Sequence, residues 1–197
     1  MSRNRLEAFS DGVIAVVITI MVLTLHPPPG SSLHDLRPLV PKIAVYLLSF
    51  VFVAIYWNNH HHLMQVVDRV NGTTLWANAH LLFWLSLTPV ATAWLGPHLG
   101  DSAPVAVYGV VLLGAAIAYW ILVRCLIGSH GPGSRITKAV GRDAKGKLSV
   151  VVYVVAIAAA PFAAWLSIAI YVAVALVWLV PDRRIERVLT PAAEDSE

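Results

Sequence analysis

The chain has 197 residues, of which 58% are hydrophobic and 13% charged, and its formal net charge at pH 7 is +3. Soluble domains are about half apolar and one quarter charged, so this composition excludes an ordinary cytosolic enzyme and a disordered chain and indicates an integral membrane protein. The basic residues gather at the ends of apolar segments, as they do in cytoplasmic loops, which explains the positive charge without a nucleic-acid partner. The single Cys125 excludes an intramolecular disulfide.

Six membrane-spanning helices are predicted, since a helix needs about 20 apolar residues to cross a bilayer. Proline, glycine and charged residues separate the apolar segments. The predicted spans cover residues 6–25, 39–64, 74–95, 104–127, 146–161 and 163–181. Together they make an all-α integral membrane protein with a single transmembrane domain, residues 1–197. The first span contains Asp11 and lacks the cleavage site of a signal peptide, so we expect it to be retained.

The last apolar segment, from Leu148 to Val180, is too long for one crossing and short for two. Basic residues flank it on both sides, and positive flanks favour the cytoplasm, so the segment must leave and return to the same side. We therefore predict two crossings with a tight outer turn near residues 160–162. This topology makes the chain a multi-pass protein of the plasma membrane with both termini and the stretch 129–147 in the cytoplasm.

Polar residues of the first three spans fall in one layer near the cytoplasmic ends of the spans. This polar layer contains Arg5, Ser10, Asp11, His60, His61 and Asn78. Ionisable groups inside spans are costly and are candidate functional residues. We expect an interhelical hydrogen-bond network that fixes helix packing; a proton relay or pH sensor is a second interpretation. A metal site is disfavoured, because consecutive histidines on a helix point about 100° apart.

Residues of the first span also recur at spacings of three and four along one stripe. The stripe contains Gly12, Val16, Thr19, Ile20 and Leu23. By itself an apolar stripe on a membrane helix is typical of packing or of lipid contact.

Three motifs carry a resemblance to a known family. They are Arg5-x-x-x-Phe9-Ser10-Asp11-Gly12 at the start of the first span, Trp57-x-x-His60-His61 at the end of the second, and Asn78 followed by Pro89 and Thr92 in the third. In these residues the chain resembles the prokaryotic members of the transmembrane protein 175 family, which are potassium channels of the lysosomal type. The resemblance covers the first three spans, about half of the chain. Val90 departs from the family's pattern, in which phenylalanine follows the proline.

The resemblance implies a homotetramer of six-span subunits in the lipid bilayer, in which the first helix of each subunit lines a pore for monovalent cations. Val16, Ile20 and Leu23 then match the positions of an apolar constriction, which opens and closes by wetting and dewetting. Thr19 matches a hydroxyl-bearing position that influences potassium selectivity. The polar layer matches an interhelical network. Permeant potassium ions are expected, and no cofactor.

The leading hypothesis is therefore a potassium-permeable cation channel with a hydrophobic constriction. A proton-coupled or proton-conducting transporter is the alternative, because the chain has eight histidines and an acidic residue, Asp11, inside a span. Many secondary transporters consist of two related halves, and no internal duplication is visible in this sequence, which makes a transporter of that design less favoured. A membrane enzyme that uses the histidines on a lipid substrate is a third hypothesis. It is disfavoured because the sequence contains no HExxH, phosphate-loop or GxSxG motif.

Overall fold

Helices make up most of the part of the chain that the computed structural model describes, residues 2–67, 69–131, 134–140 and 144–179. The elements are α1 (Arg3–Leu23), η1 (Leu33–Leu39), α2 (Val40–Gln65), α3 (Gly72–Ser86), α4 (Thr88–Leu95), η2 (Gly96–His98), α5 (Ser102–His130), α6 (Arg135–Val140), α7 (Ala144–Ala159) and α8 (Ala164–Leu179). No strand occurs among these described residues, in agreement with the predicted fold class.

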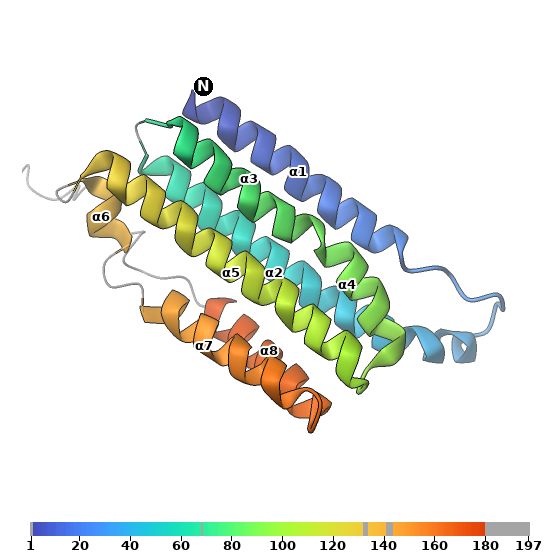
Figure 1. Ribbon diagram of the computed structural model, residues 1–197. Coiled ribbons are helices and arrows are strands. Elements are labelled where there is room, and N and C mark those ends of the chain that lie inside the picture. Colours follow the sequence, from blue (N-terminus) through green and yellow to red (C-terminus); the bar gives the residue numbers. More distant parts are fainter. Residues whose placement is uncertain (1, 68, 132–133, 141–143, 180–197) are drawn as a thin grey trace, which may run out of the picture.

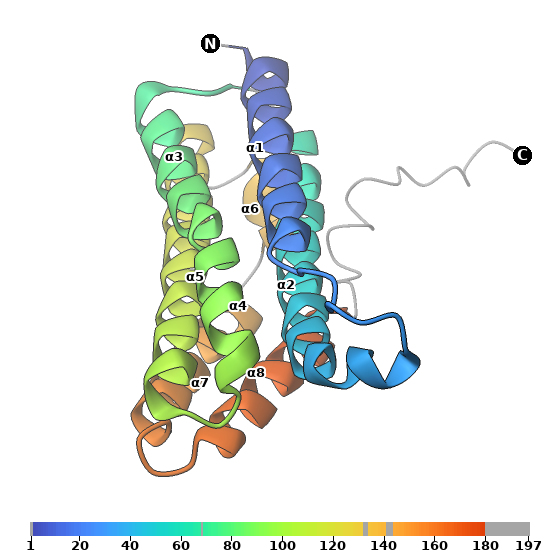
Figure 2. The same ribbon diagram turned by 90° about the vertical axis from the view of Figure 1, so that its right-hand side faces the viewer.

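Helices α1, α2, the consecutive pair α3–α4 and α5 run alongside one another as a bundle, and the hairpin of α7 and α8 packs on it (Figure 1). The N-terminus, the connection between α2 and α3, and α6 lie toward one end, here called the N-terminal end of the bundle (Figure 2). The opposite end, here called the distal end, contains the last turns of α1 and α4 and the turn between α7 and α8. The first three predicted spans therefore bring their polar residues to the same end.

Helix α1 extends over residues 3–23, slightly shifted from the predicted span 6–25. It ends before the prolines at residues 27–29, which have no backbone N–H to continue a helical ladder. Its buried face consists of Leu6, Ser10, Ile14, Val17 and Met21. These residues recur at three- and four-residue spacing, so one side of α1 packs in the bundle and the other side is left without cover in the single subunit.

The predicted third span, 74–95, is interrupted at Leu87, between α3 and α4. Pro89 explains the break, because proline lacks an N–H and its ring clashes with the carbonyl four residues earlier, here that of Leu85. Both helices still belong to one long apolar segment, Gly72–His98.

Four helical segments among the described residues are long and apolar enough to cross a membrane. They are Arg3–Leu23, Leu33–Gln65, Gly72–His98 and Ser102–His130. Helices α7 and α8 have 16 residues each, which is about 24 Å at 1.5 Å per residue and less than the roughly 30 Å of a hydrocarbon core. A turn at residues 160–162 separates them, at the position predicted from the sequence. Helix length thus supports four crossings directly.

Two glycines of α5 allow aromatic side chains to approach its backbone closely. A Cβ atom at Gly114 would overlap the indole of Trp84 from α3. At Gly109 it would overlap the hydroxyl of Tyr171 from α8, which donates a hydrogen bond to the backbone oxygen of Val105 (3.2 Å). Helix α5 is therefore the central element, packed by α3 on one side and by the α7–α8 hairpin on another.

Candidate functional site

Three buried side chains of the polar layer form a continuous chain of hydrogen bonds across α1, α3 and α2. The Ser10 hydroxyl donates to the backbone oxygen of Leu6 (2.9 Å) and accepts from Nδ2 of Asn78 (2.9 Å). Oδ1 of Asn78 lies 2.8 Å from Nε2 of His60. Because an amide oxygen only accepts, this assignment places the proton of His60 on Nε2. These hydrogen bonds connect the first three predicted spans at the N-terminal end of the bundle.

Two further contacts join α1 to α2 at the same level. Nε1 of Trp57 donates to Oδ1 of Asp11 (3.0 Å), and Nδ1 of His61 lies 3.0 Å from Oε1 of Glu7. Glu7 and Asp11 are four residues apart on α1, and so are Trp57 and His61 on α2. Each pair therefore shares one helix face, and the two contacts lie one helical turn apart between α1 and α2. Asp11 therefore has a hydrogen-bond donor inside its own subunit.

The structure places some predicted network residues differently from the expectation. Asp11 is paired with Trp57 rather than with Arg5, a histidine or an asparagine. Arg5 is exposed, and its guanidinium forms no hydrogen bond with the described part of the chain. Glu7 was not predicted, although a signal existed: Glu7 and Asp11 repeat the four-residue spacing of Trp57 and His61.

The histidine cluster does not converge on a common point. His60 faces Asn78 on α3, whereas His61 faces Glu7 on α1. Across residues 2–67, 69–131, 134–140 and 144–179, no group of three His, Cys, Asp or Glu side chains is arranged to hold a metal ion. This geometry follows the 100° rotation between successive helix positions.

A second polar group, here called the distal hydroxyl cluster, consists of Ser49, Thr92 and Tyr108 and was not predicted as a unit. The Thr92 hydroxyl donates to Oγ of Ser49 (2.7 Å), which lies 3.0 Å from the hydroxyl oxygen of Tyr108. All three side chains are buried, and Thr92 also contacts the sulfur of Met21 on α1. The sequence gives no signal for this cluster, because each helix contributes one hydroxyl with no common spacing.

The predicted stripe lies on the uncovered side of α1. Val16 is 56% exposed, Ile20 47% and Leu23 70%. Thr19 is exposed on the same side, and its hydroxyl donates to the backbone oxygen of Ala15 (2.9 Å), which leaves the lone pairs of the hydroxyl oxygen available. The stripe is therefore bare in the isolated subunit.

Val17 and Val22 are apolar residues of α1 that lie off the stripe, and they differ in exposure. Val17 is only 3% exposed and packs in the core. Val22 is 44% exposed, nearly as much as Ile20, but lies two positions, about 200°, further around the helix. Val22 is therefore the better control for a role of the stripe, because a change at Val17 also removes packing.

The fold and this division of α1 define an α-helical membrane protein whose first helix is clamped on one side by polar contacts and left bare and apolar on the other. Comparison with known proteins identifies the group more closely. The chain belongs to the TMEM175 family of ion channels: a family model described as the endosomal/lysosomal potassium channel TMEM175 matches residues 5–89. It is consequently a channel-family protein and not an enzyme.

The relatives agree on the class of protein. A protein from Chryseobacterium sp. (strain P1-3) that is named a potassium channel is 51% identical over 189 residues, which cover 96% of this chain and 98% of that protein. The crystal structure of a lysosomal potassium-selective channel TMEM175 homolog from Chamaesiphon minutus matches with a TM-score of 0.79 and 27% identity, over 92% of this chain and 97% of that chain. A Danio rerio protein named an endosomal/lysosomal proton channel TMEM175 is 27% identical over 135 residues, which cover 66% of this chain and 25% of that protein.

Proposed function

We propose that the chain is the subunit of a potassium-permeable cation channel, in which α1 from four identical subunits surrounds the ion path. The observation that carries this proposal is the bare apolar stripe of Val16, Ile20 and Leu23 on a helix whose opposite face is buried. This face of α1 packs against no other helix in the described part of its own subunit. In a member of an ion-channel family, such a face is suited to line a pore. The names of the bacterial relatives support potassium as the permeant ion.

The proposed gate is a hydrophobic constriction. Four copies of the stripe would stack apolar rings over the eight residues from Val16 to Leu23, a rise of about 10 Å along the helix. Water leaves such a constriction when it is narrow, and an ion passes only when the rings widen enough to keep part of its hydration shell. The Thr19 oxygen would offer a polar contact between the rings, and partial dehydration costs less for potassium than for sodium. We therefore expect the channel to conduct potassium with a moderate preference over sodium.

The proposed topology has six crossings with both termini in the cytoplasm of a plasma-membrane protein. It is supported by the basic residues on both sides of the last apolar segment. Helices α7 and α8, joined by the turn at residues 160–162, would supply crossings five and six. Tilting cannot lengthen a short helix, so local bilayer thinning or flanking residues would have to make up the difference.

The polar layer is proposed to be a structural clamp. Ser10, Asn78 and His60 are buried and paired, and Asp11 pairs with Trp57, so these groups point into the subunit or along its helix contacts. Their function would be to hold α1 at a fixed rotation, so that the stripe faces the pore axis. No cofactor is required for conduction by this mechanism.

Reversal potentials test the proposal. Purified protein in planar bilayers, with potassium on one side and sodium on the other, should give a potential shifted toward the potassium equilibrium potential. Discrete single-channel steps should accompany the current. A saturating flux without steps would overturn the channel mechanism in favour of a transporter.

A proton-conducting protein is the second candidate, and the names of the animal relatives favour it. The hydrogen-bonded chain from Ser10 through Asn78 to His60 is the observation on this molecule that could serve a proton path. A pH gradient at equal potassium concentrations separates the two candidates. A reversal potential that follows the proton gradient supports the proton path, and one that stays near zero supports the potassium channel.

A further inference from the structure

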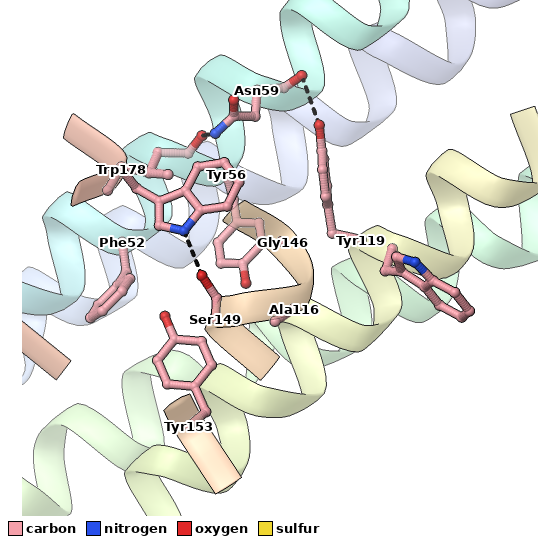
Figure 3. Close-up of a pocket in the computed structure, with 11 residues that line it drawn as sticks. Phe52, Tyr56, Asn59, Ala116, Tyr119, Gly146, Ser149, Tyr153 and Trp178 are labelled. Atoms are coloured by element: carbon pink, nitrogen blue, oxygen red, sulfur yellow. Dashed lines mark hydrogen bonds between the residues drawn. The ribbon is translucent and has the colours of Figure 1, made fainter. Parts of the chain in front are cut away.

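A cavity lies between α2, α5, α7 and α8, away from the bare face of α1. Six aromatic side chains line most of it: Phe52, Tyr56, Tyr119, Trp120, Tyr153 and Trp178 (Figure 3). Asn59 and Ser149 are the polar residues at its wall. The cavity has no part in the proposed pore and needs an explanation of its own.

One hydroxyl at this cavity, that of Tyr153, has no hydrogen-bond partner among the described residues. Nε1 of Trp178 donates to Oγ of Ser149 (2.9 Å), and the Tyr119 hydroxyl donates to the backbone oxygen of Asn59 (3.3 Å). Tyr153 is only 3% exposed, and its hydroxyl, which Figure 3 shows directed toward Ser149, forms no hydrogen bond with the described part of the chain. The Tyr153 hydroxyl is therefore available at the cavity wall to donate a hydrogen bond to an acceptor from outside the chain.

The size of the cavity limits the occupant. Its volume is about 40 Å³, and about 10–15 Å³ of such cavity space is enough to hold one water molecule. A compact drug-sized molecule does not fit. The space admits a few water molecules, or one ester group or chain segment of a longer molecule whose remainder lies along the helices outside.

The charge at one end of the cavity favours an anion. Arg124 is exposed, and its Cζ lies 5.3 Å from the ring centroid of Trp120, which lines the cavity. Lys145 and Lys147 flank Gly146, another residue of the cavity wall. Arg124 is on the last part of α5, at the N-terminal end of the bundle. Basic pockets between helices at a cytoplasmic surface attract anionic lipid head groups.

We propose that this cavity is a binding site for an anionic phospholipid. The phosphate pairs with Arg124, while an ester group enters the cavity and accepts a hydrogen bond from the Tyr153 hydroxyl, and the attached acyl chain lies along the helices outside. The placement of Arg124 at the cytoplasmic leaflet rests on the proposed topology. The site itself does not depend on whether the protein conducts potassium or protons.

Native mass spectrometry of the purified protein, titrated with phosphatidylglycerol in detergent, tests the proposal. Arg124→Gln should weaken binding about fivefold, the factor that corresponds to about 1 kcal/mol for one cation near an anionic surface. Tyr153→Phe removes only the hydroxyl and should weaken binding by a similar factor, because one net hydrogen bond contributes about as much. Matched controls at a distance, Arg37→Gln and Tyr46→Phe, should bind like the unaltered protein.

Four outcomes would overturn the proposal. Three of them are unchanged binding in both test variants, equal retention of zwitterionic phosphatidylcholine, and displacement of the lipid by glycerol phosphate, which has the head group but no chain. Occupation of the cavity by water alone, with binding insensitive to Tyr153→Phe, would also overturn it. The assay measures no ion flux. Failure here leaves the reversal-potential test of the channel untouched, and failure of the channel test leaves this one untouched.

Discussion

Removing the amide of Asn78 is expected to loosen the clamp between α1, α2 and α3. Asn78→Ala deletes two buried hydrogen bonds, to Ser10 (2.9 Å) and to His60 (2.8 Å). Ser10 keeps its bond to the backbone oxygen of Leu6, so it is not stranded. His60 is stranded, because its Nδ1 already has no partner among the described residues.

The expected size of this effect follows from the two contacts. Interhelical hydrogen bonds in membrane proteins average about 0.6 kcal/mol, so two of them amount to about 1.2 kcal/mol. Stranding a buried polar group costs about 1–3 kcal/mol. The stranding of His60 already includes the loss of its own bond, so with the bond to Ser10 added Asn78→Ala should lower the free energy of unfolding by about 1.6–3.6 kcal/mol per subunit. Asn58→Ala, on a partly buried asparagine for which the described residues provide no side-chain hydrogen bond, is the matched control and should change it by less than about 0.5 kcal/mol.

Unfolding of purified protein in mixed detergent and dodecyl sulfate micelles, followed by circular dichroism, measures this change. His60→Phe removes the other partner, so the double variant with Asn78→Ala should cost less than the sum of the single variants, as coupled residues do. Strict additivity, or an Asn78→Ala variant as stable as the Asn58→Ala control, would refute a structural contribution of this hydrogen-bonded chain.

Three other predictions concern topology and the remaining polar contacts. A cysteine at Ser134, with Cys125 replaced by alanine, should resist an impermeant thiol reagent applied outside intact cells; labelling would contradict a cytoplasmic location of the 129–147 stretch. Asp11→Ala should weaken the oligomer on size-exclusion chromatography more than it changes ion preference, since Trp57 loses its acceptor; a stable tetramer with altered selectivity alone would place Asp11 in the pore. Ser49→Ala should lower stability by about 1 kcal/mol in the same unfolding assay, since it breaks the distal hydroxyl cluster; an unchanged midpoint would show that the cluster contributes nothing.

The sequence predicted the helical class and the helices of the first four spans well, because hydropathy and proline positions act locally. The break at Leu87 could have been read from Pro89, whose effect on the helix is local as well. The turn at residues 160–162 was located by charge at the flanks of the segment.

The partners of individual side chains were harder to predict, because pairing depends on the rotation of each helix about its axis. The sequence predicted that Asp11 and the histidines lie at one level of the bundle. It did not predict that Asp11 accepts a hydrogen bond from Trp57. The distal hydroxyl cluster has no sequence signal at all. Its members come from three helices, and only packing brings Ser49, Thr92 and Tyr108 together.

Single-channel conductance of Ile20→Asn, compared with Val22→Asn, tests most directly whether α1 lines the ion path. The two side chains are exposed to nearly the same degree, 47% and 44%, and differ mainly in their direction on the helix. A polar group on the stripe should ease wetting of the constriction, so Ile20→Asn should raise conductance and Val22→Asn should leave it unchanged. Thr19→Val in the same bilayers should weaken the preference for potassium over sodium. Equal effects of Ile20→Asn and Val22→Asn, or no effect of either, would contradict a pore lined by the stripe of α1.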